Sequence, residues 1–107
     1  MSVSAASFKH APHDWDVSTA EAVAREDGLT MTDDHWELIK CLHEYYDKVE
    51  FPKLREVKDA LDEHFHTKGG MKYLYTIIPG GPVAQGCRLA GLEIPAGAVD
   101  KSFGSVA

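Results

Sequence analysis

Cysteine is scarce in this sequence, and its scarcity limits the sites that the chain can build. Cys41 and Cys87 are its only two thiols. Two are too few for a disulfide scaffold, and their spacing matches no paired zinc motif. A reducing compartment is therefore the simpler expectation, with the cytoplasm as the default location, and each thiol needs a separate explanation.

Long apolar runs and positive charge are scarce as well. The sequence has no apolar run of about 18 residues that could cross a bilayer, and its first 15 residues lack the layout of a signal peptide. Lys and Arg number 11 against 17 Asp and Glu, and 15 of the acidic residues precede position 69. Such a surface repels phosphate backbones, so we expect neither a membrane nor a nucleic acid as partner.

The fingerprints of common catalytic sites are also missing. We find no Walker-type GK[ST] motif, no GxGxxG after a strand, and no nucleophile with an adjacent base. His10 with His13, and His64 with His66, could approach each other, but neither pair has a third ligand at a recognisable spacing. We therefore predict no metal, no cofactor and no stand-alone enzyme.

Length and composition predict one globular domain, because 107 residues with 44% apolar and 26% charged residues are ordinary for a single core. Local signals then predict helices. Ser18 followed by Glu21 has the spacing of a capping box, which predicts a first helix from about Thr19 until Gly28. We interpret this helix as structural.

The longest predicted helix covers about residues 33–47. Thr32 is its candidate N-cap, and His35 in the first turn is expected to be a packed or capping side chain rather than a catalyst. Apolar residues then repeat every three or four positions, as they do in a well-buried amphipathic helix: Trp36, Ile39, Leu42 and Tyr46. Cys41 lies on this stripe, so we expect it in the core and without a redox role.

Three shorter helices are predicted in the rest of the chain. Pro52 suits the first turn of a helix at about 53–66. Residues 71–78 predict a short apolar helix, although a strand is the competing interpretation because these residue types favour strands. Pro82 then opens a helix of about two turns that carries Cys87.

The C-terminal third of the chain carries a family resemblance. Residues 68–95, KGGMKYLYTIIPGGPVAQGCRLAGLEIP, are similar to the signature of the DsrC/TusE family. This family includes the gamma subunit of dissimilatory sulfite reductase and the tRNA-thiolation relay protein TusE. Further segments resemble family positions in the same order: HDW at 13–15, LTMTDDHWELI at 29–39, HEYYD at 43–47 and PKLR at 52–55.

The resemblance implies an all-α fold, a small orthogonal bundle of about five helices. The bundle is expected at 18–92, between an N-terminal segment at 1–17 and a flexible C-terminal arm at 93–107. The resemblance also implies that cysteine thiols carry sulfur between proteins. The implied donor is a sulfurtransferase, and the implied acceptor is a sulfite reductase or a tRNA-thiolation enzyme.

Two departures from the family pattern bear on this interpretation. The family usually ends in a Gly-Cys-Val type tail whose penultimate cysteine is the principal sulfur carrier, but here Ala98 stands at that position and eight residues follow Val99. The family's two-cysteine disulfide therefore cannot form. Relatives often have a β-hairpin before the DW position, whereas only 14 residues precede Trp15, so we expect the hairpin to be shortened or absent.

Cys87 corresponds to the second family cysteine and is the candidate catalytic residue. A persulfide relay needs a thiolate, which nearby positive charge favours, and Arg88 is the only cation within a dozen residues. Arg88 is therefore the candidate binding residue. Adjacent helical residues point about 100° apart, however, and the last turn of a helix disfavours an anion, so activation by Arg88 stays open.

Two hypotheses of function follow from the resemblance and its departures. In the first, the protein is a sulfurtransferase-like carrier that accepts and passes persulfide sulfur through Cys87 while docked on partner proteins. In the second, it is a regulatory or binding paralogue that keeps the docking surface but has lost the terminal thiol, as Ala98 suggests.

Overall fold

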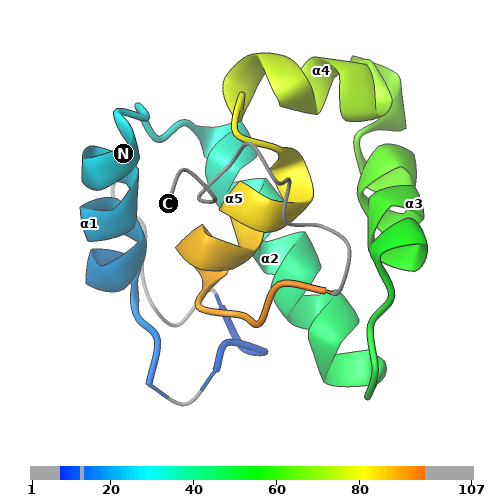
Figure 1. The fold of residues 1–107 in the computed structure, drawn as a ribbon, viewed down its shortest axis with the longest axis horizontal. Coiled ribbons are helices and arrows are strands. Elements are labelled where there is room, and N and C mark those ends of the chain that lie inside the picture. Colours follow the sequence, from blue (N-terminus) through cyan, green and yellow to red (C-terminus); the bar gives the residue numbers. More distant parts are fainter. Residues whose placement is uncertain (1–7, 13, 96–107) are drawn as a thin grey trace, which may run out of the picture.

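The computed structural model describes residues 8–12 and 14–95. These residues form five α-helices and one turn of 3-10 helix, without a strand among them (Figure 1). The all-α prediction is confirmed, and the segment for which a strand was the alternative is helical. In chain order the elements are α1 (Val17–Asp27), α2 (Asp33–Lys48), α3 (Leu54–His64), η2 (His66–Lys68), α4 (Gly70–Ile77) and α5 (Pro82–Ala90).

Helix α5 is the central element of the bundle. In Figure 1, α1 and α3 lie on its two sides, α4 crosses above it and α2 runs behind it. Accordingly, α5 contacts each of these four helices. Every residue of α5 is buried except Arg88, which is half-buried. A helix that is covered all round needs small or apolar side chains on most of its surface, and PVAQGCRLA supplies them except at Gln85 and Arg88, which both hydrogen-bond to Asp27.

Close packing of α5 on α2 depends on a glycine. A methyl group at Gly86 would lie 2.8 Å from Cδ2 of Leu38 and 3.1 Å from Cδ1 of Leu42, both fully buried side chains on α2. The missing side chain therefore lets the two helices approach closely. The next residue, Cys87, is brought against α2 as a result.

Helix α1 begins earlier than predicted. Its N-cap is Asp16, whose carboxylate accepts a 2.9 Å hydrogen bond from the backbone N–H of Thr19. The capping box predicted at Ser18 is therefore wrong, because the carboxylate two residues earlier already satisfies an exposed amide of the first turn. The C-terminal boundary is as predicted, since Gly28 ends the helix with φ at 73°.

Helix α2 begins after Thr32, as predicted, and His35 is part of its cap. Nδ1 of His35 accepts a 3.1 Å hydrogen bond from the backbone N–H of Thr32. Because Nδ1 accepts, Nε2 carries the hydrogen and donates it to the carbonyl oxygen of Ile77 at 2.9 Å. His35 is thus a buried capping residue that joins the start of α2 to the end of α4.

Helix α3 is shorter than predicted at both ends. Lys53 keeps an extended backbone, with φ at −108° and ψ at 145°, and serves as the N-cap, so Pro52 lies before the helix rather than in its first turn. At the other end the helix stops at His64, and η2 takes over. Helix α5 matches its prediction: Pro82 is its first residue, and Gly91 caps it with φ at 72°.

Candidate functional site around Cys87

Cys87 lies in the last turn of α5 with 0% of its surface exposed. Its Sγ is 3.4 Å from the hydroxyl oxygen of Tyr46, near the C-terminal end of α2. Burial raises the pKa of the Cys87 thiol to about 11. The thiol is therefore neutral at physiological pH in this conformation.

The hydroxyl of Tyr46 makes a second contact. It donates a 2.8 Å hydrogen bond to the carbonyl oxygen of Glu93, just beyond α5. We call residues 92–95 the strap. They follow the cap of α5 and include the carbonyl group that accepts this hydrogen bond. Leu92 and Ile94 are half-buried against the core and Pro95 is buried, so this part of the chain lies on the bundle. The remaining residues of the predicted arm, 96–107, including Ala98, lie outside the described residues.

A cavity of about 190 Å³ lies between the strap and the end of α2. It is lined by Tyr46, Glu50, Phe51, Pro52 and the strap residues Glu93, Ile94 and Pro95. Tyr46 lines this cavity and also contacts Sγ of Cys87, which is not itself a lining residue. Among the lining residues, Phe51 is 77% exposed.

Arg88 is directed toward the end of α1 instead of the thiol. Its Nη1 donates to both carboxylate oxygens of Asp27 at 2.9 Å, and Nη2 is 3.8 Å from Glu26. Gln85, one turn earlier, donates to the same Asp27 carboxylate at 3.0 Å. No hydrogen bond among the described residues joins Arg88 to Cys87. The structure therefore gives Arg88 a role in packing α5 on α1, and its predicted binding role stays a prediction.

Comparison with known proteins identifies the family of this chain. The family model described as "DsrC like protein" matches residues 1–99. The chain belongs to the DsrC-like family. The sulfurtransferase TusE of Yersinia pseudotuberculosis serotype I is 32% identical over 84 residues, which are 77% of this chain and 78% of the relative. The Salmonella typhimurium sulfurtransferase TusE is 34% identical over 85 residues, 76% of each chain.

A solved structure supports the same assignment. The NMR structure of Allochromatium vinosum DsrC is 40% identical to this chain, with a TM-score of 0.67, and the match covers 80% of this chain and 79% of that one. These comparisons confirm the predicted DsrC/TusE family and its helical fold. They also confirm the predicted class of function, sulfur relay, because the TusE relatives are named sulfurtransferases and the chain belongs to the same family. They do not test which thiol carries sulfur.

Cys41 is the other cysteine of this DsrC-like chain. Cys41 is half-buried on α2 and packs against the core, as its position on the apolar stripe predicts. Burial raises the pKa of its thiol to about 11, and the negative charges of Glu44 and Glu37 add to the effect. The prediction that Cys41 has no redox role stays untested.

Among the described residues, no group of three or more His, Cys, Asp and Glu side chains is placed to hold a metal ion. His10 instead lies 2.8 Å from the carboxylate of Asp47, and His64 lies 2.8 Å from that of Glu37. His13 lies outside the described residues. Within the described part of the chain, the helices are also too short or too polar to cross a membrane.

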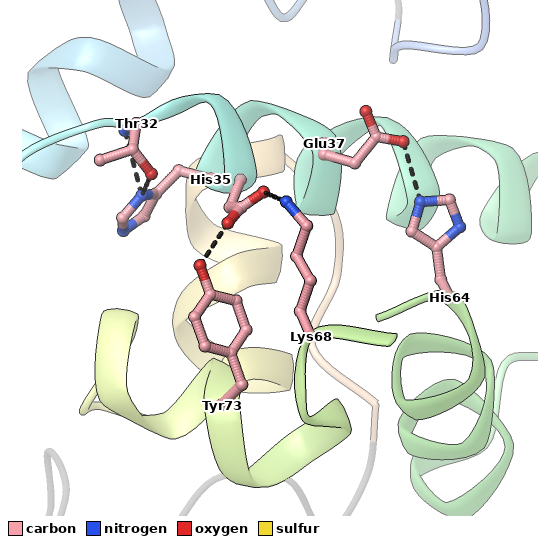
Figure 2. Close-up of polar contacts among 7 residues, drawn as sticks. Thr32, His35, Glu37, His64, Lys68 and Tyr73 are labelled. Carbon is pink, nitrogen blue, oxygen red and sulfur yellow. Dashed lines mark hydrogen bonds and ion pairs between the residues drawn. The ribbon is translucent and has the colours of Figure 1, made fainter. Parts of the chain in front are cut away.

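A polar cluster at the start of α2 was not predicted from the sequence. Lys68 and Tyr73 both point to the carboxylate of Asp34, and His64 points to Glu37 (Figure 2). The Lys68 ammonium donates to Asp34 at 2.6 Å. This hydrogen bond, followed by that of Tyr73, holds the pKa of Asp34 below its ordinary value. Tyr73 belongs to the family's KYLY segment, so part of that signature is explained by a side-chain hydrogen bond that joins α4 to α2.

Proposed function

We propose that this protein relays sulfur through Cys87, accepting a persulfide sulfur from one protein and passing it to another. The single observation that carries the proposal is the family match, which includes the segment GPVAQGCRLAGL at 81–92 around this thiol. On this proposal the donor is a sulfurtransferase, and the acceptor is a sulfite reductase or a tRNA-thiolation enzyme. The location is the cytoplasm, where thiols stay reduced.

The transfer step is an exchange between two thiols without net oxidation. The Cys87 thiolate attacks the terminal sulfur of a donor cysteine persulfide, forming a new S–S bond as the donor's S–S bond breaks. The donor cysteine leaves as a thiolate and takes up a proton equivalent to the one that Cys87 has lost. The products are a Cys87 persulfide and a free donor thiol.

The closed bundle prevents this reaction. With a pKa of about 11 for Cys87, about 1 thiol in 10⁴ is ionised at pH 7. The sulfur also has no exposed surface that a donor could reach. Transfer therefore requires a conformation in which the thiol is uncovered.

Moving the strap should require less free energy than moving α5. Helix α5 is held by four other helices. The strap is held by two half-buried side chains, Leu92 and Ile94, and by the buried Pro95. Two hydrogen bonds add to these contacts, one from Tyr46 to the carbonyl oxygen of Glu93 and one from the backbone N–H of Leu92 to the carbonyl oxygen of Cys87. Local opening takes place where buried contacts are fewest. A docking partner that displaces residues 92–95 would expose Cys87 without unfolding the bundle.

Intact-mass measurement tests the proposal. The protein is incubated with a persulfide donor, and a gain of about 32 Da is expected, which Cys87→Ser abolishes and Cys41→Ser leaves in place. If the parent protein gains no sulfur on Cys87, transfer through this residue is refuted. A Cys87→Ser protein that still binds the same partners would then identify the regulatory paralogue of the second hypothesis.

A further inference from the structure

The hydroxyl of Tyr46 lies between two groups and can donate to only one of them. It is 2.8 Å from the carbonyl oxygen of Glu93 and 3.4 Å from Sγ of Cys87. A phenol has a single hydrogen, a carbonyl oxygen is a strong acceptor, and a sulfur atom is a weak one. The hydrogen of Tyr46 is therefore committed to Glu93, and the thiol of Cys87 must be the donor in the second contact.

We propose, on the basis of the sulfur-relay function above, that Tyr46 is a positioning residue that couples the strap to the ionisation of Cys87. While the strap is closed, the Tyr46 oxygen accepts the S–H hydrogen. When residues 92–95 move away, the hydroxyl loses its carbonyl acceptor and turns to donate its hydrogen to the Cys87 thiolate. The same movement thus uncovers the sulfur and stabilises its reactive form.

The proton balance makes Tyr46 a hydrogen-bond donor and not a base. Burial raises the pKa of Tyr46 well above its ordinary value, so the phenol keeps its hydrogen. The proton lost by Cys87 passes to solvent, or to the thiolate that leaves the donor. A hydrogen bond to an anion is stronger than one to a neutral thiol, so it favours the ionised sulfur.

Other charged groups near this pair do not supply that stabilisation. The strap contributes Glu93, and the loop after α2 contributes Glu50, which lines the same cavity as Tyr46. Both are acidic and disfavour a second negative charge. On α2 the neighbouring side chain is Tyr45, whose hydroxyl contacts Glu56 at 3.3 Å. On α5 the neighbouring cation, Arg88, is paired with Asp27.

The closed state is tested by infrared spectroscopy of the S–H stretch. In a Cys41→Ser background Cys87 is the only thiol of the chain. Tyr46→Phe removes the acceptor of its hydrogen, so the S–H band is expected at higher frequency. Tyr45→Phe is the matched control and should leave the band in place. An unchanged band in Tyr46→Phe would overturn the assigned direction of the hydrogen bond.

The open state is tested by the pH dependence of alkylation. In the Cys41→Ser background, Ile94→Asn removes an apolar anchor of the strap without adding charge, and Ile94→Ala is the milder second variant. Alkylation of Cys87 by iodoacetamide at pH 7 should become faster. Adding Tyr46→Phe to the opened protein should raise the pKa of Cys87 by about one unit, a tenfold loss of thiolate. Adding Tyr45→Phe instead should leave the pKa of Cys87 unchanged.

Two outcomes would overturn the proposal. Equal Cys87 pKa values in the opened proteins with and without Tyr46→Phe would show that Tyr46 only packs. If neither Ile94 variant reacted faster than its parent, the strap would not be what covers the sulfur. Both results are separable from the proposed function, because a Cys87 persulfide that still forms would leave sulfur relay intact while removing Tyr46 from it.

Discussion

Trp15 donates a 2.7 Å hydrogen bond from its indole Nε1 to the carbonyl oxygen of Leu89, 74 positions later in the chain. The indole also packs edge-on against His43, with ring centroids 4.6 Å apart. Trp15 is therefore fixed to the end of α5 and to α2. This anchor holds the cap of α5, from which the strap continues.

The cap residue Gly91 should be much less tolerant of substitution than the equivalent Gly28. Both have left-handed backbones, with φ at 72° and 73°, but a methyl group at Gly91 would lie 2.7 Å from Cδ1 of Trp15, whereas at Gly28 nothing lies within 4 Å. We expect Gly28→Ala to cost about 1 kcal/mol and Gly91→Ala roughly 2–4 kcal/mol of unfolding free energy. Urea denaturation followed by tryptophan fluorescence measures both. Equal losses would mean that Trp15 moves aside without cost.

Alkaline pH should destabilise the fold through Cys87. Its pKa is about 11 in the folded protein against an ordinary value of 9.0, so the unfolded chain releases its proton first. The stabilising contribution is complete below pH 9 and is lost as pH rises to about 11, at about 1.4 kcal/mol per pH unit. We expect the unfolding free energy of Cys41→Ser to fall more steeply over this range than that of Cys41→Ser with Cys87→Ala. Parallel curves would contradict the burial of this thiol.

Mild acid should also destabilise the fold, through His43. Its ring is 1% exposed, Nε2 donates to the carbonyl oxygen of Ala90 at 2.9 Å, and Nδ1 has no partner among the described residues. Burial lowers the pKa of His43 below its ordinary 6.5, so the unfolded chain takes up a proton first and stability falls as pH drops below that value. Ring-proton NMR titration should give His43 a midpoint below 6.5. A midpoint above it would refute this environment.

Removing the charge of the Arg88 side chain should weaken the packing of α5 on α1 and leave the pKa of Cys87 unchanged. Arg88→Gln breaks the two hydrogen bonds to Asp27, whose side chain is 14% exposed. We expect a loss of about 1–2 kcal/mol of unfolding free energy, because Asp27 loses its charged partner while Arg88 itself is partly solvated. Arg25→Gln, exposed on the same α1, is the control. A rise in the Cys87 pKa in Arg88→Gln would instead restore the predicted activation by this cation.

The helices could be predicted from the sequence because their signals are local. Thr32, Pro82 and Gly91 stand where a helix begins or ends, and the stripe that contains Leu42 predicts the buried face of α2. The predicted helix boundaries were wrong where two local signals competed. Asp16, for example, caps α1 two residues before the predicted Ser18.

The candidate site was predicted only in part, because its contacts join distant positions. Cys87 could be identified by its surroundings in the sequence, but Tyr46 lies 41 positions earlier and was recognised only as an apolar position of the stripe. The partner of Arg88, Asp27, lies 61 positions away. No local pattern says which of several acidic residues a cation will reach, or whether an adjacent thiol faces the same way.

The position of α5 in the chain has a consequence for protein synthesis. The helix that fills the middle of the bundle, Pro82–Ala90, is translated after the four helices that surround it. Until it leaves the ribosome, buried side chains such as Leu38 and Leu42 lack one of the surfaces that cover them. A nascent chain halted before Pro82 would therefore expose apolar residues and attract chaperones, and folding is completed only after translation has passed this helix.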